Sequence, residues 1–259
     1  MNTGMILHTI LGLLLLLIPA GALYLTDQKQ LRGFALGVGR MIGQLMVLCL
    51  MVWVLVHYDR WWLNLLWLVL IAGWSTTKIL QRAKLDLHKF MMPVGISVLA
   101  SVFVVGVYLL FAVLPTERAF AARWFVPVTA LLMGHSTAMM IRGLNTYVSA
   151  LKTDEQQYEF LRGNGASHLK AVMPFVRRAL HAILAPTIAN LSTTALFTMP
   201  LLLCGILIAG VQPINAFVVT LMLIVASVAS SVLTLIIALW LSDSRLFDKF
   251  GKLLTGRIG

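Results

Sequence analysis

The sequence predicts an all-α integral membrane protein with about seven transmembrane helices. Of its 259 residues, 60% are hydrophobic and 11% are charged, whereas a soluble domain carries about 25% charged residues. So few charges cannot cover a core of this size with a hydrated surface. The apolar residues form long runs, which favour helices over the alternating strands of a membrane barrel. Two distant cysteines, Cys49 and Cys204, exclude a disulfide scaffold.

Seven windows have the length and composition of a membrane span, which needs about 20 mostly apolar residues. No Asp, Glu, Lys or Arg occurs from residue 179 to residue 242, and the turn signal Gln212-Pro213-Ile214-Asn215 divides this stretch into two spans. The first window could also be a signal peptide, but no basic residue precedes it, which favours a retained helix. The predicted spans are residues 5–25, 34–56, 61–79, 92–114, 124–144, 182–211 and 216–241.

The basic residues predict the orientation of the chain. With seven spans, sixteen of the 20 Lys and Arg residues fall on one side, three fall on the other, and Arg40 lies inside a span. Basic residues concentrate on the cytoplasmic side of a membrane, so we expect the N-terminus outside and the C-terminus in the cytoplasm. The net charge of +11 therefore reflects topology and contact with lipid head groups, and nucleic acid is not an expected partner.

The sequence predicts a single transmembrane domain over residues 1–259, with a cytoplasmic segment at 152–178 and a basic cytoplasmic tail at 242–259. The segment is too short for a nucleotide-binding fold, and the sequence contains no Gly-x-x-x-x-Gly-Lys-Ser/Thr loop. If the protein uses ATP, we therefore expect another chain to bind it.

The cytoplasmic segment has the pattern of two short helices. Thr153 with Gln156 matches a capping box and predicts a helix start, and Gly163-Asn164-Gly165 predicts its end. Ser167 can cap a second short helix that runs toward Pro174. The apolar contacts of the pair would come from Tyr158, Phe160, Leu161 and Leu169. From these residues alone, a solvated connection lying on the lipid head groups is an equal alternative.

The chain resembles a known family. Glu159 to Gly165 has the spacing of the Glu-Ala-Ala-x-x-x-Gly coupling loop of ABC-transporter permeases, with Phe160 and Leu161 at the alanine positions. Together with other motifs between Arg32 and Trp240, this segment resembles the Fet-type permeases, which are bacterial membrane subunits assigned to iron export and related to plant aluminium-tolerance permeases. The other motifs are Gly39-Arg40-Met41-Ile42-Gly43-Gln44-Leu45, Pro127, Met133-Gly134, Gly165-Ala166-Ser167, Ala185-Pro186-Thr187, Met199-Pro200 and Gly205 to Pro213.

The resemblance implies the permease subunit of an ABC transporter in the bacterial cytoplasmic membrane, exporting a metal ion such as iron. It implies a homodimer joined by separate ATP-binding cassette subunits, which hold ATP and Mg, so that this chain binds no cofactor and is not an enzyme. The family pattern is altered at Gly134-His135-Ser136-Thr137 and at Met199-Pro200-Leu201-Leu202-Leu203, so the architecture carries over more safely than the substrate. The residues implied to contact the ATP-binding partner are Glu155, Tyr158, Glu159, Leu161, Gly163, Gly165 and Ser167.

One part of the second span carries polar side chains and small residues. Arg40 and Gln44 are four residues apart, and Gly39 and Gly43 leave room for close packing. We expect the helix face with Arg40 and Gln44 to contact another helix or a second copy of the chain. The alternative is that Arg40 extends to the lipid head groups.

His135 is the candidate for a substrate path. It lies near the middle of the fifth span, between Met133 and Met139, and Met199 and Cys204 of the sixth span could add soft donors for a transition metal. The alternative is that these side chains are ordinary core residues. No fixed ligand spacing such as Cys-x-x-Cys occurs, so a permanent metal site is not expected. Pro186 and Pro200 predict a broken sixth span.

A stand-alone carrier or channel driven by an ion gradient is the alternative function. Such a carrier would need carboxylates within the membrane. All nine acidic residues fall at span ends or in connections, which favours an energy source in another protein.

Overall fold

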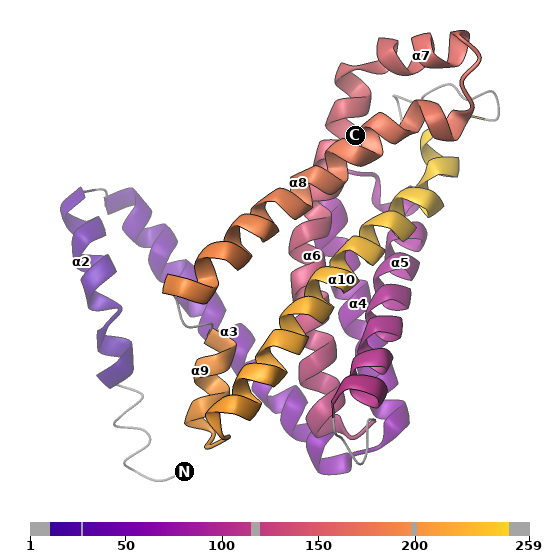
Figure 1. The fold of residues 1–259 in the computed structure, drawn as a ribbon. Helices are drawn as coiled ribbons and strands as arrows, with labels where there is room; N and C mark the ends of the chain where they lie inside the picture. Colours follow the sequence, from indigo (N-terminus) through magenta and orange to yellow (C-terminus); the bar gives the residue numbers. More distant parts are fainter. Residues whose placement is uncertain (1–10, 27, 115–119, 198–200, 249–259) are drawn as a thin grey trace. The chain divides into compact units, whose positions relative to one another are not determined.

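The structure is a computed structural model that describes residues 11–26, 28–114, 120–197 and 201–248. Helices joined by short connections account for these residues, and no strand occurs among them, which confirms the all-α prediction (Figure 1). The elements are α2 (Leu17–Thr26), α3 (Gln28–Tyr58), α4 (Trp61–Ala83), α5 (Leu87–Tyr108) with the π-helical turn η1 (Leu109–Val113), α6 (Ala122–Thr153), α7 (Glu155–Gly163), α8 (His168–Phe197), α9 (Leu201–Ile208) and α10 (Pro213–Leu246).

Five of the predicted spans are confirmed by the length and apolar composition of their helices. These helices are α3, α4, α5 with η1, α6 and α10. Helices α6 and α10 are longer than predicted, because each continues beyond the apolar stretch into polar sequence. The predicted first span is described from residue 11 onward, where residues 11–26 form a shorter apolar helix. The total of seven spans and the orientation of the termini stay predictions.

The region predicted as the sixth span differs from expectation. The second short helix, expected to run toward Pro174, is instead the beginning of α8, which continues through Pro174 and Pro186 to Phe197. A proline removes one backbone hydrogen bond and crowds one carbonyl. The remaining hydrogen bonds of this helix of 30 residues, together with its packing along α6, keep it helical. The prediction of a break at Pro186 is wrong, and Pro200 lies outside the described residues.

The chain divides into two compact units, residues 1–58 and residues 59–259. In the first unit, α2 and α3 pack against each other. In the second unit, α4, α5, α6 and α10 form a bundle, in which α10 packs against α5 and α6, and α4 packs against the same two helices (Figure 1). Helix α8 packs along α6, and α7 lies beyond one end of the bundle. The second unit therefore positions the segment of residues 152–178.

A glycine brings three helices of the bundle together. A β-carbon added to Gly143 in α6 would lie 2.9 Å from both Cδ atoms of Leu235 in α10, and 3.3 Å from Cγ2 of Ile183 in α8. Both neighbouring side chains are fully buried. Because only a residue without a β-carbon allows this approach, Gly143 fixes the crossing of α6 with α8 and α10.

The opposite end of the bundle from α7 is closed by two polar contacts. Asp59, in a left-handed conformation with φ of 38°, accepts a hydrogen bond of 2.7 Å at Oδ1 from the backbone nitrogen of Ala122. Asn64 is fully buried in α4, and its Nδ2 donates to the carbonyl of Phe120 over 2.8 Å. These contacts satisfy free backbone groups at the start of α6 and tie it to the start of α4.

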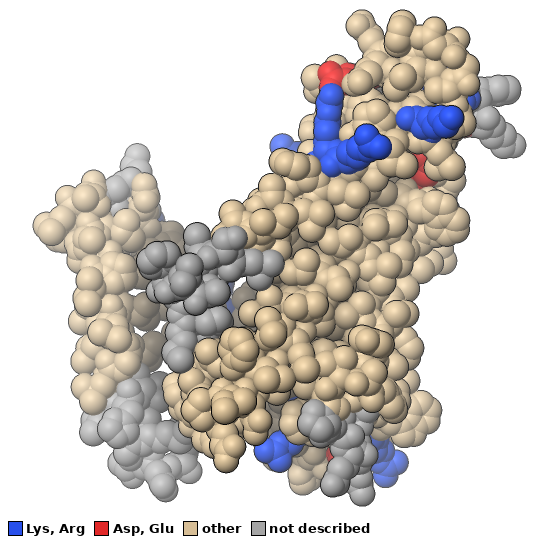
Figure 2. All heavy atoms as spheres, viewed as in Figure 1, with Lys and Arg blue, Asp and Glu red and all other residues tan. Residues whose placement is uncertain are grey.

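Charges concentrate at the two ends of the second unit. Figure 2 shows Lys and Arg near α7 and the beginning of α8, and again at the other end, while the described surface between them carries no visible charge on this face. A bundle whose middle is apolar on its outside and whose ends are charged is suited to a lipid bilayer.

Candidate functional site

The candidate site is the α7–α8 hairpin, which comprises residues 154–178. Its turn is stabilised locally, because Gly165 adopts a positive φ of 83° and the backbone nitrogen of Ala166 donates to the carbonyl of Leu161 over 3.0 Å. This arrangement satisfies the last carbonyls of α7. The predicted helix end at Gly163-Asn164-Gly165 is therefore confirmed, and so is the helix start after the turn, at His168.

The predicted capping box at Thr153 and Gln156 is wrong. Thr153 is the last residue of α6, and Asp154 is the junction with α7, with no capping hydrogen bond from its side chain. The carboxylate of Asp154 instead forms an ion pair with Arg178 of α8. Arg178 also donates to Oε1 of Gln157 over 3.5 Å. The side chain of Asp154 thus bonds to Arg178, 24 positions away, and does not cap the start of α7.

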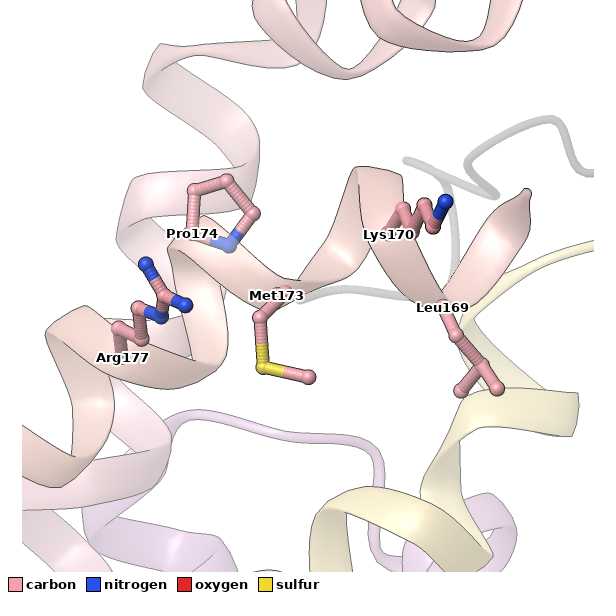
Figure 3. A pocket seen from close by; sticks show the side chains of 5 residues that line it. All are labelled: Leu169, Lys170, Met173, Pro174 and Arg177. Carbon is pink, nitrogen blue, oxygen red and sulfur yellow. The ribbon is translucent and has the colours of Figure 1, made fainter. Parts of the chain in front are cut away.

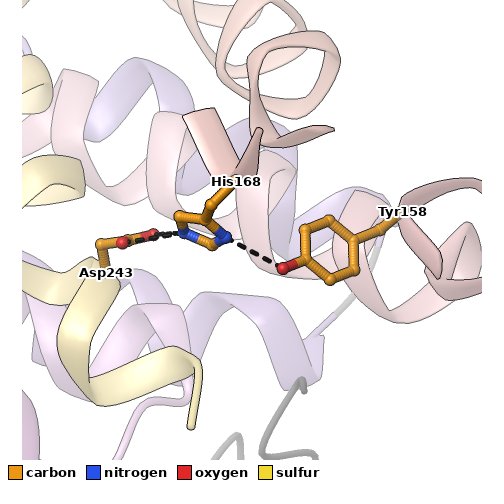
Figure 4. Close-up of polar contacts among 3 residues, drawn as sticks. All are labelled: Tyr158, His168 and Asp243. Carbon is orange, nitrogen blue, oxygen red and sulfur yellow. Dashed lines mark hydrogen bonds and ion pairs between the residues drawn. The ribbon is translucent and has the colours of Figure 1, made fainter. Parts of the chain in front are cut away.

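Tyr158 anchors the hairpin. Its side chain is 2% exposed, and its hydroxyl lies 2.9 Å from Nδ1 of His168, the first residue of α8. Nε2 of His168 lies 2.9 Å from each carboxylate oxygen of Asp243 in α10 (Figure 4). The ring of Phe247 packs against both other rings, with centroids 5.0 Å from Tyr158 and 4.7 Å from His168. We call the three polar residues the Tyr158–His168–Asp243 cluster.

The chemistry of the cluster fixes its hydrogen atoms. A carboxylate only accepts hydrogen bonds, so Nε2 of His168 donates to Asp243, and in the neutral imidazole Nδ1 accepts from the hydroxyl of Tyr158. Burial raises the pKa of Tyr158, and the charge of Asp243 acts in the same direction, against a lowering by Arg162. Tyr158 therefore stays protonated and donates. Every member of the cluster has a partner.

The outer surface of the hairpin is apolar and basic. Phe160 and Leu169 are each 69% exposed. A pocket of about 290 Å³ lies on α8, where the side chains of Leu169 and Met173 point to one side (Figure 3). The residues that line this pocket are Leu169, Lys170, Met173, Pro174 and Arg177. Within the described residues, neither cation has an acidic partner. We call Phe160 with the pocket residues the exposed hairpin surface.

The residues implied to contact a partner protein all lie on this hairpin. Tyr158 is buried, and Glu155 and Leu161 are half-buried. The remaining four are exposed and accessible to another molecule: Glu159, Gly163, Gly165 and Ser167. Of the residues expected to make apolar contacts, Tyr158 is buried and Leu161 packs against the core, whereas Phe160 and Leu169 are largely exposed.

The structure does not gather the predicted soft donors into a fixed site. Met133 is buried in the core, and the sulfur of Met139 accepts from Oγ1 of Thr187 at 3.8 Å. Nε2 of His135 is buried and has no hydrogen-bond partner within the described chain. Cys204 is half-buried in α9, and Met199 lies outside the described residues. Among the residues that the structure describes, no three His, Cys, Asp or Glu side chains are grouped to hold a metal ion.

The polar face of α3 is exposed. Arg40 and Gln44 are both exposed, and a β-carbon added at Gly39 or Gly43 would meet no atom within 4 Å. This face is thus accessible, and its contact with another helix or a second copy stays a prediction.

The sequence analysis missed a line of buried hydroxyl groups between α5, α6 and α10. Ser101 of α5 contacts Thr234 of α10, and Ser136 of α6 lies 3.2 Å from Ser230 and 3.4 Å from Ser231. We call these residues the hydroxyl seam. A signal was available, because Ser227, Ser230, Ser231 and Thr234 have the i, i+3, i+4, i+7 spacing of one helix face.

Comparison with known proteins agrees with this architecture. Residues 6–247 match the model of a family described as "Uncharacterised protein family (UPF0014)". The chain belongs to the UPF0014 family. This membership, together with the relatives described next, confirms the resemblance to Fet-type permeases.

Several relatives are similar over most of the chain. The "Probable iron export permease protein FetB" of Escherichia coli is 24% identical over 100% of this chain and 99% of its own length. The "UPF0014 membrane protein STAR2" of rice is 29% identical over 70% of this chain and 60% of its own. The "Protein ALUMINUM SENSITIVE 3" of Arabidopsis thaliana is 23% identical over 78% and 69%. No solved structure matches the chain significantly.

Family membership and the long apolar helices agree on the class of protein. The chain is a multi-pass membrane protein with the transport role of a permease. Its helices and its bacterial relative fit the inner membrane, as predicted.

Proposed function

We propose that this UPF0014 protein is the transmembrane subunit of an ABC exporter, that a metal ion such as iron is its cargo, and that a separate subunit binds ATP with Mg. The observation that carries the proposal is the exposed hairpin surface. Phe160 on α7 and Leu169 on α8 are exposed at the charged end of the bundle, and Leu169 and Met173 share a pocket with two cations that have no acidic partner in the described part of the chain. Clustered apolar side chains on such a surface are typical of a protein contact.

The hairpin is also firmly attached, as a coupling element must be. Tyr158 holds α7 from inside, and the ion pair of Asp154 with Arg178 holds the junction of α6 to α8. A force applied to the exposed hairpin surface therefore reaches α6 and α8 directly. In the proposed mechanism, ATP-driven closure of the partner pushes on the hairpin, α6 and α8 tilt, and the cavity changes from inward-facing to outward-facing.

The cargo and the second copy are part of the same proposal. The name of the Escherichia coli relative supports iron export, and His135, whose buried Nε2 has no hydrogen-bond partner among the described residues, offers a donor for a metal in transit. Met133, Met139, Met199 and Cys204 would supply further soft donors along the path. The accessible face of α3 with Arg40 and Gln44 is where we propose that two copies meet.

Co-purification tests the partner. The protein is expressed with its genomic neighbours and purified in mild detergent, and we expect an ATP-binding subunit to be retained. Phe160→Glu places a charge on the exposed hairpin surface and should abolish retention, whereas the matched control Gln156→Glu, on the same helix, should not. If no such subunit is retained and Phe160→Glu transports normally, the stand-alone carrier driven by an ion gradient replaces this proposal.

Metal content tests the cargo. Cells that lack the protein should accumulate iron, and expression of the protein should restore the normal level. An unchanged iron level together with a change in another solute would assign the cargo to that solute.

A further inference from the structure

We propose that the Tyr158–His168–Asp243 cluster transmits movement of the α7–α8 hairpin to α10, which makes these three residues positioning residues for transport. This inference rests on the proposed function, because the movement originates in an ATP-binding subunit. According to this inference, the hairpin moves α10 in addition to α6 and α8.

The cluster is the place where three helices meet through side chains. Tyr158 comes from α7, His168 from α8 and Asp243 from α10, and each polar contact is 2.9 Å long. Phe247, directly after α10, packs against both rings. The imidazole of His168 thus uses both of its nitrogens, one toward α7 and one toward α10 (Figure 4).

The contacts are of a kind that resists separation. If the hairpin moved without α10, the carboxylate of Asp243 would lose its imidazole donor, and the ring of Phe247 would lose its packing against Tyr158 and His168. The side chains of the polar pair are only partly exposed, at 27% for His168 and 33% for Asp243, and a hydrogen bond to a carboxylate is among the stronger ones. The low-cost response is for the hairpin and the end of α10 to move together.

From Asp243, a displacement can reach the middle of the bundle. Thr234 lies nine residues earlier in α10, about 14 Å along the helix axis, and contacts Ser101 of α5. Ser230 and Ser231 contact Ser136 of α6, which directly follows His135 in the chain. Helix α10 therefore joins the cluster at one end of the bundle to the polar contacts beside the candidate path residue.

The first experiment measures how much metal is exported for each ATP hydrolysed by the complex in lipid vesicles. Tyr158→Phe keeps the ring and removes the hydroxyl, and Asp243→Asn keeps the size and removes the charge. We expect both variants to lower this ratio about tenfold. Lys89→Gln is the control, because it breaks the ion pair with Asp86 at the start of α5 and removes no contact of the hairpin or of Asp243, and it should leave the ratio within about twofold.

The second experiment needs no ATP-binding subunit. Backbone hydrogen exchange of the purified full-length protein reports local opening. Tyr158→Phe should speed exchange at residues 240–246 of α10, and Asp243→Asn should speed exchange in α7, whereas Arg178→Gln should leave α10 unchanged.

The two experiments separate the possible failures. If the complex forms but both cluster variants keep the wild-type ratio, the proposed transmission is wrong while the proposed function stands. If no ATP-binding subunit associates, the proposed function fails, and faster exchange across the cluster would then show only a structural link. If exchange does not spread from α7 to α10, the link itself is absent.

Discussion

The α-carbon of Gly143 faces Leu235 so closely that a β-carbon would lie 2.9 Å from both Cδ atoms of the leucine. Gly143→Ala should therefore lower the free energy of unfolding by about 1–3 kcal/mol, as overpacking of a core does, despite a gain in helix propensity of up to about 1 kcal/mol. Thermal denaturation in detergent measures the change.

Gly106→Ala is the matched control for this substitution. A β-carbon at Gly106 in α5 would lie 3.7 Å from Leu132 and 3.8 Å from Thr129, at ordinary contact distances. We expect its melting temperature to equal or exceed that of the wild type. Equal stability of the two variants would show that Leu235 moves aside without cost.

His135→Leu distinguishes a path residue from a core residue. Because Nε2 of His135 is buried without a partner in the described chain, an apolar replacement removes an unsatisfied polar group and should not lower thermal stability. If His135 contacts the metal, export should nevertheless fall at least tenfold, measured as metal efflux from vesicles. Normal efflux from a stable variant would make His135 a packing residue.

Thr234→Val tests the hydroxyl seam. It removes the contact with Ser101, and hydrogen bonds between membrane helices contribute about 0.6 kcal/mol on average. Thr76→Val is the control, because the hydroxyl of Thr76 bonds to Ala72 of its own helix over 2.7 Å. We expect Thr234→Val to cost more stability than the control, and an equal cost would remove any special role for the seam.

Tyr158 should make stability depend on alkaline pH. Burial is the main cause that raises the pKa of Tyr158 in the folded state, whereas the pKa in the unfolded state is about 10. At a pH between these two pKa values, Tyr158 loses its proton in the unfolded chain and keeps it in the folded protein. Stability is full below pH 10 and falls as pH rises through this window. Melting temperatures from pH 8 to pH 11 should fall less steeply for Tyr158→Phe than for the wild type. Parallel curves would refute this assignment.

The two cations of the hairpin pocket should strengthen the contact with the ATP-binding subunit. An exposed charge contributes up to about 1 kcal/mol, so Lys170→Gln combined with Arg177→Gln should weaken the affinity about tenfold, and salt should weaken the wild type in the same way. Lys78→Gln is the control, since Lys78 lies over the ring of Trp74 on α4. Equal affinity of all three proteins would place the contact elsewhere.

Local features of the structure were predictable from sequence, whereas contacts between distant residues were not. The apolar runs predicted the five confirmed spans, because a bilayer demands length and hydrophobicity from each helix separately. The turn at Gly165 was predictable because it needs one glycine at positive φ. The capping box at Thr153 was mispredicted, because the partner of Asp154 is Arg178, which no local pattern indicates. His168 and Asp243 are 75 residues apart, so their contact depends on the packing of α8 near α10.

The hydroxyl seam allows α10 to slide along α5 without losing the hydrogen bonds that Ser101 and Thr234 can make within their own helices. Oγ of Ser101 lies 2.7 Å from the carbonyl of Ser97, and Oγ1 of Thr234 lies 2.7 Å from the carbonyl of Ser230, so each hydroxyl can donate to its own helix when the contact between them is broken. If α10 slid past α5, neither hydroxyl would be left without a hydrogen-bond partner inside the membrane. The hydroxyl seam therefore lowers the energy barrier to sliding between the two helices.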